Sequence, residues 1–208
     1  MTLIKEYTNL TSKVLDVGCS NGAFLQALKN NNVLNVFGID VQKETINFAQ
    51  GKNLNCYYGS FPDNLPKELE QKYDIITSFE NIYYMPNLLS FFEKVSSLLA
   101  INGKLILKFN QSSSSYYFKH PYHIRTGDFS TFINLDTICF LAKKNNLDIV
   151  KIVPFDNNYL TNYLGYSSWK TKPKVKMSFF LKVVNKISKL IVPIKYADKI
   201  IIILKNKH

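Results

Sequence analysis

Apolar runs alternate with helical patterns through about the first 150 residues of this chain. The runs are short and rich in Val, Ile and Leu, as buried strands are, whereas apolar residues recur every three or four positions in 87–100 and 135–144. Strands alternating with helices predict an α/β fold in which helices cover both faces of a largely parallel sheet. The expected strands are residues 13–17, 33–39, 53–58, 73–78, 104–109, 147–153 and 199–204.

Residues 14–22 are the most informative segment and read Val-Leu-Asp-Val-Gly-Cys-Ser-Asn-Gly. The first apolar strand ends here in a loop with two glycines, and a helical pattern follows from Ala23. Such a turn brings backbone N–H groups and a helix N-terminus close to a ligand. Eighteen residues after Gly22 the second apolar run ends in Asp40, where a carboxylate can accept both hydroxyls of a ribose. Together the two features predict a nucleoside ligand.

The glycine spacing distinguishes two kinds of nucleoside. Dinucleotide-binding loops read G-x-G-x-x-G and place a pyrophosphate on the helix N-terminus. Here three residues separate Gly18 from Gly22, and Asp16 would repel a pyrophosphate but can face a cation. This segment, together with Asp40, resembles the signature of class I S-adenosylmethionine (SAM) methyltransferases. The resemblance implies a Rossmann-like sheet of seven strands with the last one antiparallel, SAM as cofactor, and S-adenosylhomocysteine as product.

The resemblance also implies roles for individual residues. The glycines let the backbone approach the methionine part of SAM, Asp16 reaches its ammonium group, and Asp40 holds the ribose. Val41 packs beside the adenine, residues 60 and 61 follow the third strand near the adenine, and residues 78 and 79 form the floor under the methionine end. The full expected set of cofactor-binding residues is Asp16, Gly18, Cys19, Ser20, Gly22, Asp40, Val41, Ser60, Phe61, Ser78 and Phe79.

Two further segments are similar to the small-molecule methyltransferases of the ubiquinone-biosynthesis type. After the fourth expected strand, members commonly carry Glu-His-Val-Pro-Asp, whereas residues 83–87 here read Tyr-Tyr-Met-Pro-Asn. Residues 120–123, His-Pro-Tyr-His, are similar to the subgroup's substrate side. The resemblance covers about residues 13–153 and specifies no substrate. Because the Glu-His pair is missing and no other ligand cluster stands out, we expect no metal site.

The chemistry of methyl transfer narrows the choice of catalytic residues. The leaving thioether of a sulfonium is already activated, so alignment and desolvation can supply most of the catalysis. A hydroxyl acceptor benefits from a general base, and histidine suits that role near neutral pH. His123 is the preferred candidate and His120 the second, since His208 lies at the end of the chain. Tyr84 is expected to shape or orient the acceptor.

Net charge adds a separate feature. The 208 residues carry a net charge of +11, and residues 170–208 hold eleven lysines and one acid. This basic stretch lies mostly in an expected insertion, about residues 155–197, between the last two strands of a single domain. The insertion includes an amphipathic basic helix at about 176–192. The helix can pack on the sheet edge with solvated lysines, form a dimer contact, lie on an anionic membrane surface, or bind an anionic acceptor. Nucleic acid is not expected.

Other bulk features bear on location. Three scattered cysteines fit a reducing compartment, and the N-terminus lacks the pattern of a signal peptide. The longest pure apolar run near the C-terminus, residues 200–204, is far too short to span a membrane. These features predict a cytoplasmic protein, with peripheral contact at the inner membrane surface as the role open to the basic helix.

The sequence therefore predicts a SAM-dependent methyltransferase that acts on a hydroxyl of a small-molecule or glycan-type acceptor. Surface polysaccharide synthesis is one setting that the subgroup resemblance suggests. Two alternatives remain open: an N-methyltransferase for a small amine such as phosphoethanolamine, and a non-catalytic partner protein that keeps the fold.

Overall fold

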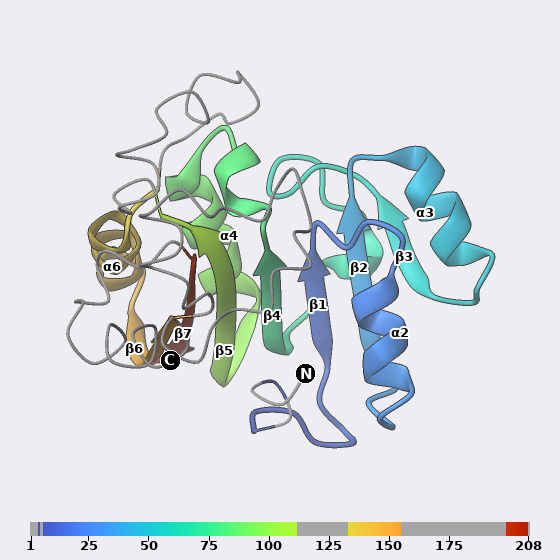
Figure 1. Ribbon diagram of the computed structural model, residues 1–208, viewed down its shortest axis with the longest axis horizontal. Coiled ribbons are helices and arrows are strands. Elements are labelled where there is room, and N and C mark those ends of the chain that lie inside the picture. The colour runs from blue at the N-terminus through green and yellow to red at the C-terminus, as the bar shows by residue number, and fades with distance from the viewer. Residues whose placement is uncertain (1–3, 5, 112–132, 155–198, 208) are drawn as a thin grey trace, which may run out of the picture.

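The computed structural model of the protein describes residues 4, 6–111, 133–154 and 199–207, which form a seven-stranded sheet with helices packed on it (Figure 1). The strands are β1 (Val14–Val17), β2 (Val36–Asp40), β3 (Asn55–Tyr58), β4 (Tyr73–Phe79), β5 (Leu99–Asn110), β6 (Leu147–Pro154) and β7 (Lys199–Asn206). The helices are α2 (Ala23–Lys29), α3 (Lys43–Gln50), α4 (Leu88–Leu98) and α6 (Leu135–Lys144), with two 3₁₀ turns, η1 (Lys67–Leu69) and η2 (Ile82–Tyr84).

The strand order is β3-β2-β1-β4-β5-β7-β6. Strands β1 to β5 pair in parallel, and β7 runs antiparallel to both β5 and β6. This topology confirms the predicted seven-stranded Rossmann-like sheet with an antiparallel last strand. The chain order reverses between β1 and β4, and in open α/β sheets ligands bind outside the carboxyl ends of the strands at such a switch point.

Apolar side chains on the two faces of the sheet form two separate cores. On one face Val14, Val36 and Ile75 pack against α2 and α3, whose buried residues include Leu25 and Ile46. On the other face the next residues along the strands, such as Leu15 and Ile76, pack against α4 and α6. The central strands are buried on both faces, which explains their nearly continuous apolar sequence.

Side-chain caps fix the start of the two helices on the second face. The Asn87 side chain accepts a hydrogen bond from the Ser90 backbone N–H at 3.1 Å, as expected for a cap before α4. Asn134 accepts one from the Thr137 N–H at 2.8 Å and begins α6 in the same way. The described residues include no helix that is both long and apolar enough to cross a membrane.

The start of β5 differs from the sequence prediction. We expected helix 87–100, then a turn at Asn102-Gly103 and a strand from 104, but α4 ends at Leu98 and β5 begins at Leu99. The pairing with β4 shifts from Tyr73↔Leu99 to Ile75↔Lys104, and Asn102 has φ 62°. The turn-forming residues therefore produce an irregularity inside a long strand, because residues on both sides of them pair with β4. The expected insertion and its basic helix, 155–197, lie outside the described residues.

Candidate active site

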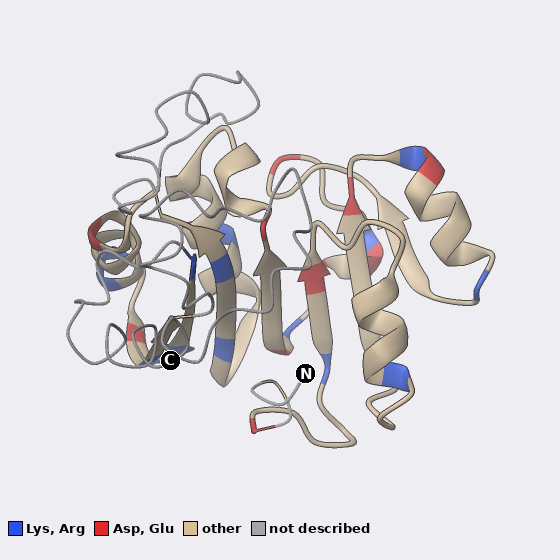
Figure 2. Cartoon of the chain, in the orientation of Figure 1, with Lys and Arg blue, Asp and Glu red and all other residues tan. Residues whose placement is uncertain are grey.

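A pocket lies at the carboxyl ends of β1, β2 and β3, beside the segment that follows β4. It contains about 460 Å³ of space, part of it open to solvent. Figure 2 shows acidic positions at the ends of the neighbouring strands β1, β2 and β4. The lining residues are Val17, Gly18, Ile39, Asp40, Val41, Gly59, Ser60, Phe61, Asn81, Tyr84, Met85 and Pro86.

The loop after β1 turns sharply on residues with positive φ. Gly18 has φ 80°, Ser20 has φ 48° and Gly22 has φ 73°. The backbone N–H groups of Gly18 and Cys19 both donate to the Ile39 carbonyl, at 2.8 and 3.1 Å, so the loop is fixed to the end of β2. A Cβ at position 18 would overlap the Asn81 side chain, so only glycine fits there.

Gly22 has a packing role in the structure. It is the N-cap of α2 in a left-handed conformation, and it does not line the pocket. A Cβ there would lie 2.5 Å from Leu54 Cδ1 and 3.2 Å from Ala49 Cβ. Because Gly22 has no side chain, the start of α2 can pack closely against α3 and the residues at β3. This close packing fixes the end of the loop that leads into α2.

The Asp40 carboxylate is held in place by backbone groups. One oxygen accepts the Ser20 N–H at 2.8 Å and the other accepts the Gln42 N–H at 2.9 Å. A carboxylate has about four lone-pair sites, so both oxygens keep capacity for further donors. The next residue, Val41, is 63% exposed and offers apolar surface at the rim of the pocket. This pair can bind a diol and an aromatic base side by side.

Asp16 is a buried acid behind the loop. It is 4% exposed, and its Oδ1 accepts a hydrogen bond from the Thr77 hydroxyl at 2.6 Å. Burial raises the pKa of the Asp16 carboxyl from 3.8 to about 7, although the Thr77 hydrogen bond opposes the rise and the Asp40 charge adds to it. A cation near this acid would favour its ionised form.

We predict that Asp16 makes the stability of the protein depend on pH. Its pKa is higher in the folded than in the unfolded chain, so its contribution to stability is complete below about pH 4 and is lost as the pH rises through about 7. Asp16→Asn removes this titration and keeps an oxygen for Thr77. The melting temperature of the variant, relative to wild type, should therefore rise between pH 5 and pH 8. A difference that stays constant across this range would contradict the prediction.

Asn81 is a pocket residue that the sequence reasoning missed. Its side-chain amide lies against Gly18 and donates to the Val17 carbonyl at 3.2 Å, so it ties the segment after β4 to the end of β1. No pattern along the chain indicates this contact, since β1 and β4 are neighbours only through the strand order. The hydrogen bond from Ser20 to Asp40 was likewise not expected, although it joins the two parts of the predicted site.

The structure places the expected cofactor residues in two groups. Gly18, Asp40, Val41, Ser60 and Phe61 line the pocket, together with Tyr84, which was expected at the acceptor. The other expected residues support the pocket or lie behind it; they are Asp16, Cys19, Ser20, Gly22, Ser78 and Phe79. The expected catalytic residues His120 and His123 lie outside the described residues.

Two of the supporting residues, Cys19 and Ser78, are buried, and Phe79 is half-buried against a core. The Cys19 side chain is 5% exposed beside Cys56, and a hydrogen bond to Cys56 together with burial raises the pKa of the Cys19 thiol above its ordinary value. The Phe79 ring packs edge-on against Phe24 at 5.1 Å between centroids. The Ser78 hydroxyl is buried and has no hydrogen-bond partner among the described residues. Phe61 lines the pocket but is 4% exposed and packs edge-on against Phe91, so it also belongs to the core.

The comparison with protein families identifies the chain. A family model described as a methyltransferase domain matches residues 2–152. The chain belongs to this methyltransferase family. Among curated proteins, the methyltransferase is similar to a ubiquinone biosynthesis O-methyltransferase from Pelagibacter ubique, with 27% identity over 186 residues that cover 83% of this chain and 75% of that protein.

Solved structures share the fold of this methyltransferase. A SAM-dependent methyltransferase from Archaeoglobus fulgidus superposes with a TM-score of 0.72 and 19% identity, over 99% of this chain and 90% of the other. A geranyl diphosphate C-methyltransferase from Streptomyces coelicolor, solved with S-adenosylhomocysteine, gives a TM-score of 0.68 and 12% identity, over 100% and 79% of the two chains. The chain is thus a SAM-dependent methyltransferase, as its glycine loop and Asp40 predicted.

The residues of the pocket fit this cofactor. SAM is an adenosyl sulfonium with a ribose diol, an adenine ring and a cationic ammonium group. The pocket supplies a fixed carboxylate with spare acceptor sites, an exposed apolar side chain next to it, and a loop without a Cβ at Gly18. The buried Asp16 carboxyl has a raised pKa, and a cation would stabilise its ionised form. Among the described residues, no group of three or more His, Cys, Asp or Glu could hold a metal ion.

Proposed function

We propose that this enzyme transfers the methyl group of SAM to a hydroxyl group of a small-molecule acceptor, and that SAM occupies the pocket described above. The similarity to the Pelagibacter ubique O-methyltransferase supports the choice of a hydroxyl. The aromatic and apolar rim of the pocket, with Tyr84 48% exposed beside Met85, supports a small organic acceptor. The glycan acceptor expected from the sequence stays a prediction, since none of the three named proteins is described as acting on a glycan.

In the proposed mechanism each residue has a specific task. Asp40 accepts the ribose hydroxyls, Val41 packs on the adenine, and the backbone at Gly18 follows the methionine part. When bound, SAM supplies an activated methyl group for in-line transfer. Asp16 lies behind the loop and does not line the pocket, so its ionised form would stabilise the ammonium group through a water. Fixed groups of this kind accelerate the reaction mainly through alignment and exclusion of water.

The proton of the acceptor hydroxyl needs a destination, and we propose His123 as the base. This assignment comes from the sequence, since the residue lies outside the described part of the chain. His123→Ala should lower kcat by about tenfold for a phenolic or catechol acceptor, because the activated sulfonium leaves alignment as the larger factor. The affinity for SAM should not change. A variant with full activity would remove His123 from the mechanism and favour an amine acceptor, which needs no strong base.

The acceptor class is tested directly by measuring S-adenosylhomocysteine release. The wild-type enzyme is incubated with SAM and with matched pairs of acceptors that differ only in a hydroxyl or an amine at the same position. Catechols and phenols with apolar side chains form the first set, and phosphoethanolamine is included as the alternative amine. The proposal predicts that turnover requires the hydroxyl. Turnover with the amine alone would contradict it.

A further inference from the structure

Glu80 is a strained residue immediately after β4. Its φ is 56°, a left-handed conformation that side chains other than Gly, Asn or Asp rarely adopt. Residues held in such conformations persist only where the surrounding structure determines them, and they are concentrated at functional sites. Glu80 is not among the residues that line the pocket. The left-handed conformation of Glu80 therefore points to an effect on the residues next to it.

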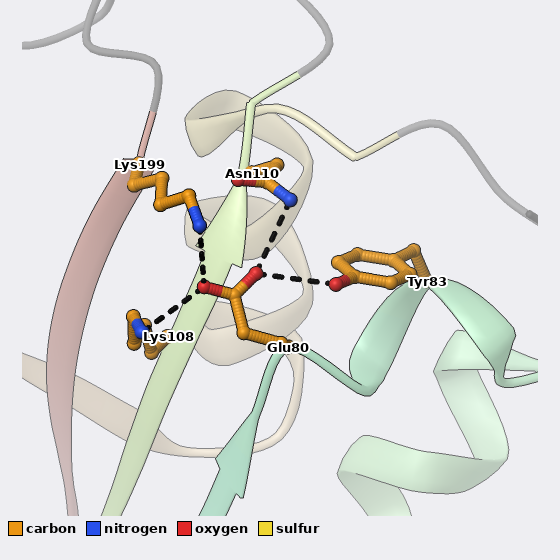
Figure 3. Close-up of polar contacts among 5 residues, drawn as sticks. All are labelled: Glu80, Tyr83, Lys108, Asn110 and Lys199. Carbon is orange, nitrogen blue, oxygen red and sulfur yellow. Dashed lines mark hydrogen bonds and ion pairs between the residues drawn. The ribbon is translucent and has the colours of Figure 1, made fainter. Parts of the chain in front are cut away.

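Side chains from β5, β7 and η2 converge on the Glu80 carboxylate (Figure 3). The ammonium groups of Lys108 on β5 and Lys199 on β7 both lie 3.1 Å from Oε1. The Tyr83 hydroxyl donates to Oε2 at 3.1 Å, and the Asn110 amide donates to the same oxygen at 3.2 Å. The Glu80 backbone N–H donates to the Lys108 carbonyl at 2.8 Å. A single part-exposed ion pair stabilises a protein little, so several contacts acting together are needed to hold this turn.

The turn at Glu80 sets the direction of the pocket wall. The next residue, Asn81, lies against Gly18 and donates to the Val17 carbonyl. The 3₁₀ turn η2 follows; its last residue, Tyr84, and the next residue, Met85, line the pocket. The hydrogen bond from Tyr83 to the Glu80 carboxylate fixes η2 to the same point. The carboxylate thus connects β5 and β7 with the wall that faces the loop after β1.

We propose that Glu80 is a positioning residue of the cofactor pocket. Its carboxylate holds the left-handed turn after β4, and this turn places Asn81 against Gly18 and sets η2 as the opposite wall. The inference rests on the proposal that SAM occupies this pocket. Glu80 contacts neither the cofactor nor the acceptor in this account, and it acts through Asn81 and Tyr83.

The test compares Glu80→Ala with a matched ion-pair variant. Glu70→Ala breaks the 2.6 Å contact between Glu70 and Lys94, which joins the end of η1 to α4 away from the pocket. Calorimetry with SAM is done well below the melting temperature of each protein. Without the carboxylate we expect the pocket-forming turn to be populated about one fifth of the time, so SAM affinity falls about fivefold. Glu70→Ala should bind SAM as the wild type does, even if its melting temperature falls.

Hydrogen exchange supplies a second readout that a purely stabilising role would not change. The Tyr84 N–H donates to the Asn81 carbonyl at 2.9 Å and the Met85 N–H to the Ile82 carbonyl at 3.2 Å. In Glu80→Ala these amides should exchange faster than the wild-type amides, while amides of α3 keep their wild-type rates. In Glu70→Ala all of them should keep those rates.

A conservative variant keeps the inference testable if Glu80→Ala does not fold. Glu80→Gln retains an oxygen for Tyr83 and Asn110 but loses the charge that attracts the two lysines. Its SAM affinity and its exchange rates at η2 should lie between those of the wild type and Glu80→Ala. If Glu80→Ala does not fold, Glu80→Gln should still bind SAM more weakly and exchange faster at η2 than the wild type. Wild-type SAM affinity together with wild-type exchange in the glutamine and alanine variants would overturn the inference. Absence of SAM binding in the wild-type protein would instead overturn the proposed function.

Discussion

Gly18→Ala should weaken SAM binding by at least about a hundredfold, roughly 2.7 kcal/mol. Two costs combine in this variant. Alanine at φ 80° carries the penalty of a left-handed backbone, on the order of 1–2 kcal/mol. The added Cβ also overlaps the Asn81 side chain, so Asn81 has to move away from the Val17 carbonyl, which changes the shape of the pocket that it lines.

Gly51→Ala is the matched control for this prediction. Gly51 is the C-cap of α3 and has φ −59°, and the nearest atoms to a Cβ there are backbone oxygens at 3.4 and 3.5 Å. The variant should fold and bind SAM as the wild type does. Calorimetry with both variants, with circular dichroism to verify folding, gives the comparison. Equal SAM affinity in the two variants would show that the loop after β1 does not form the cofactor site.

Asp40→Ala should weaken SAM binding by at least about a hundredfold, roughly 2.7 kcal/mol. The lost hydrogen bonds from the ribose hydroxyls to a carboxylate contribute about 1.5–3 kcal/mol each when the carboxylate is charged. The variant also loses the acceptors of the Ser20 and Gln42 N–H groups, so the loop after β1 is no longer fixed to the end of β2 through this side chain. Asp40→Asn should lie between the alanine variant and the wild type, because its amide keeps one acceptor oxygen.

The control for Asp40 is Glu44→Ala, which removes an exposed acid from the first turn of α3. It changes the net charge of the protein by the same amount as Asp40→Ala but does not touch the pocket. SAM affinity measured by calorimetry should be unchanged in this variant. If Asp40→Ala bound SAM within twofold of Glu44→Ala, the assignment of the ribose to Asp40 would be wrong.

Local sequence patterns predicted the strands and singled out Gly18 and Asp40, which line the pocket, whereas the antiparallel last strand followed from the family resemblance. The apolar runs predicted each of the seven strands, and Asn87 was identified as a helix cap from its place before an amphipathic pattern. Gly18 was predicted because it lies in the glycine loop directly after the first apolar run. Asp40 was predicted because it ends the second apolar run. Such features depend on neighbours in the chain, so the sequence displays them directly.

The contacts that complete the pocket depend on residues far apart in the chain. Asn81 meets Gly18 only because β4 pairs with β1, and the carboxylate of Glu80 meets Lys199 only because β7 inserts beside β5. Gly38 shows the same effect: a Cβ there would lie 2.6 Å from the Cys19 sulfur, so this glycine allows the thiol to be buried under the loop. No spacing in the sequence indicates these pairs. The long start of β5 from Leu99 was missed for a similar reason, because pairing with β4 overrides the local turn preference of Asn102.

The most direct test is a crystal structure of the protein soaked with S-adenosylhomocysteine. Density for the adenosyl group should fill the pocket, with the ribose hydroxyls at the carboxylate of Asp40, the adenine against Val41, and the amino-acid end along the backbone of Gly18. Density for the nucleoside at any other place, with the Asp40 pocket left to solvent at saturating ligand, would contradict the account.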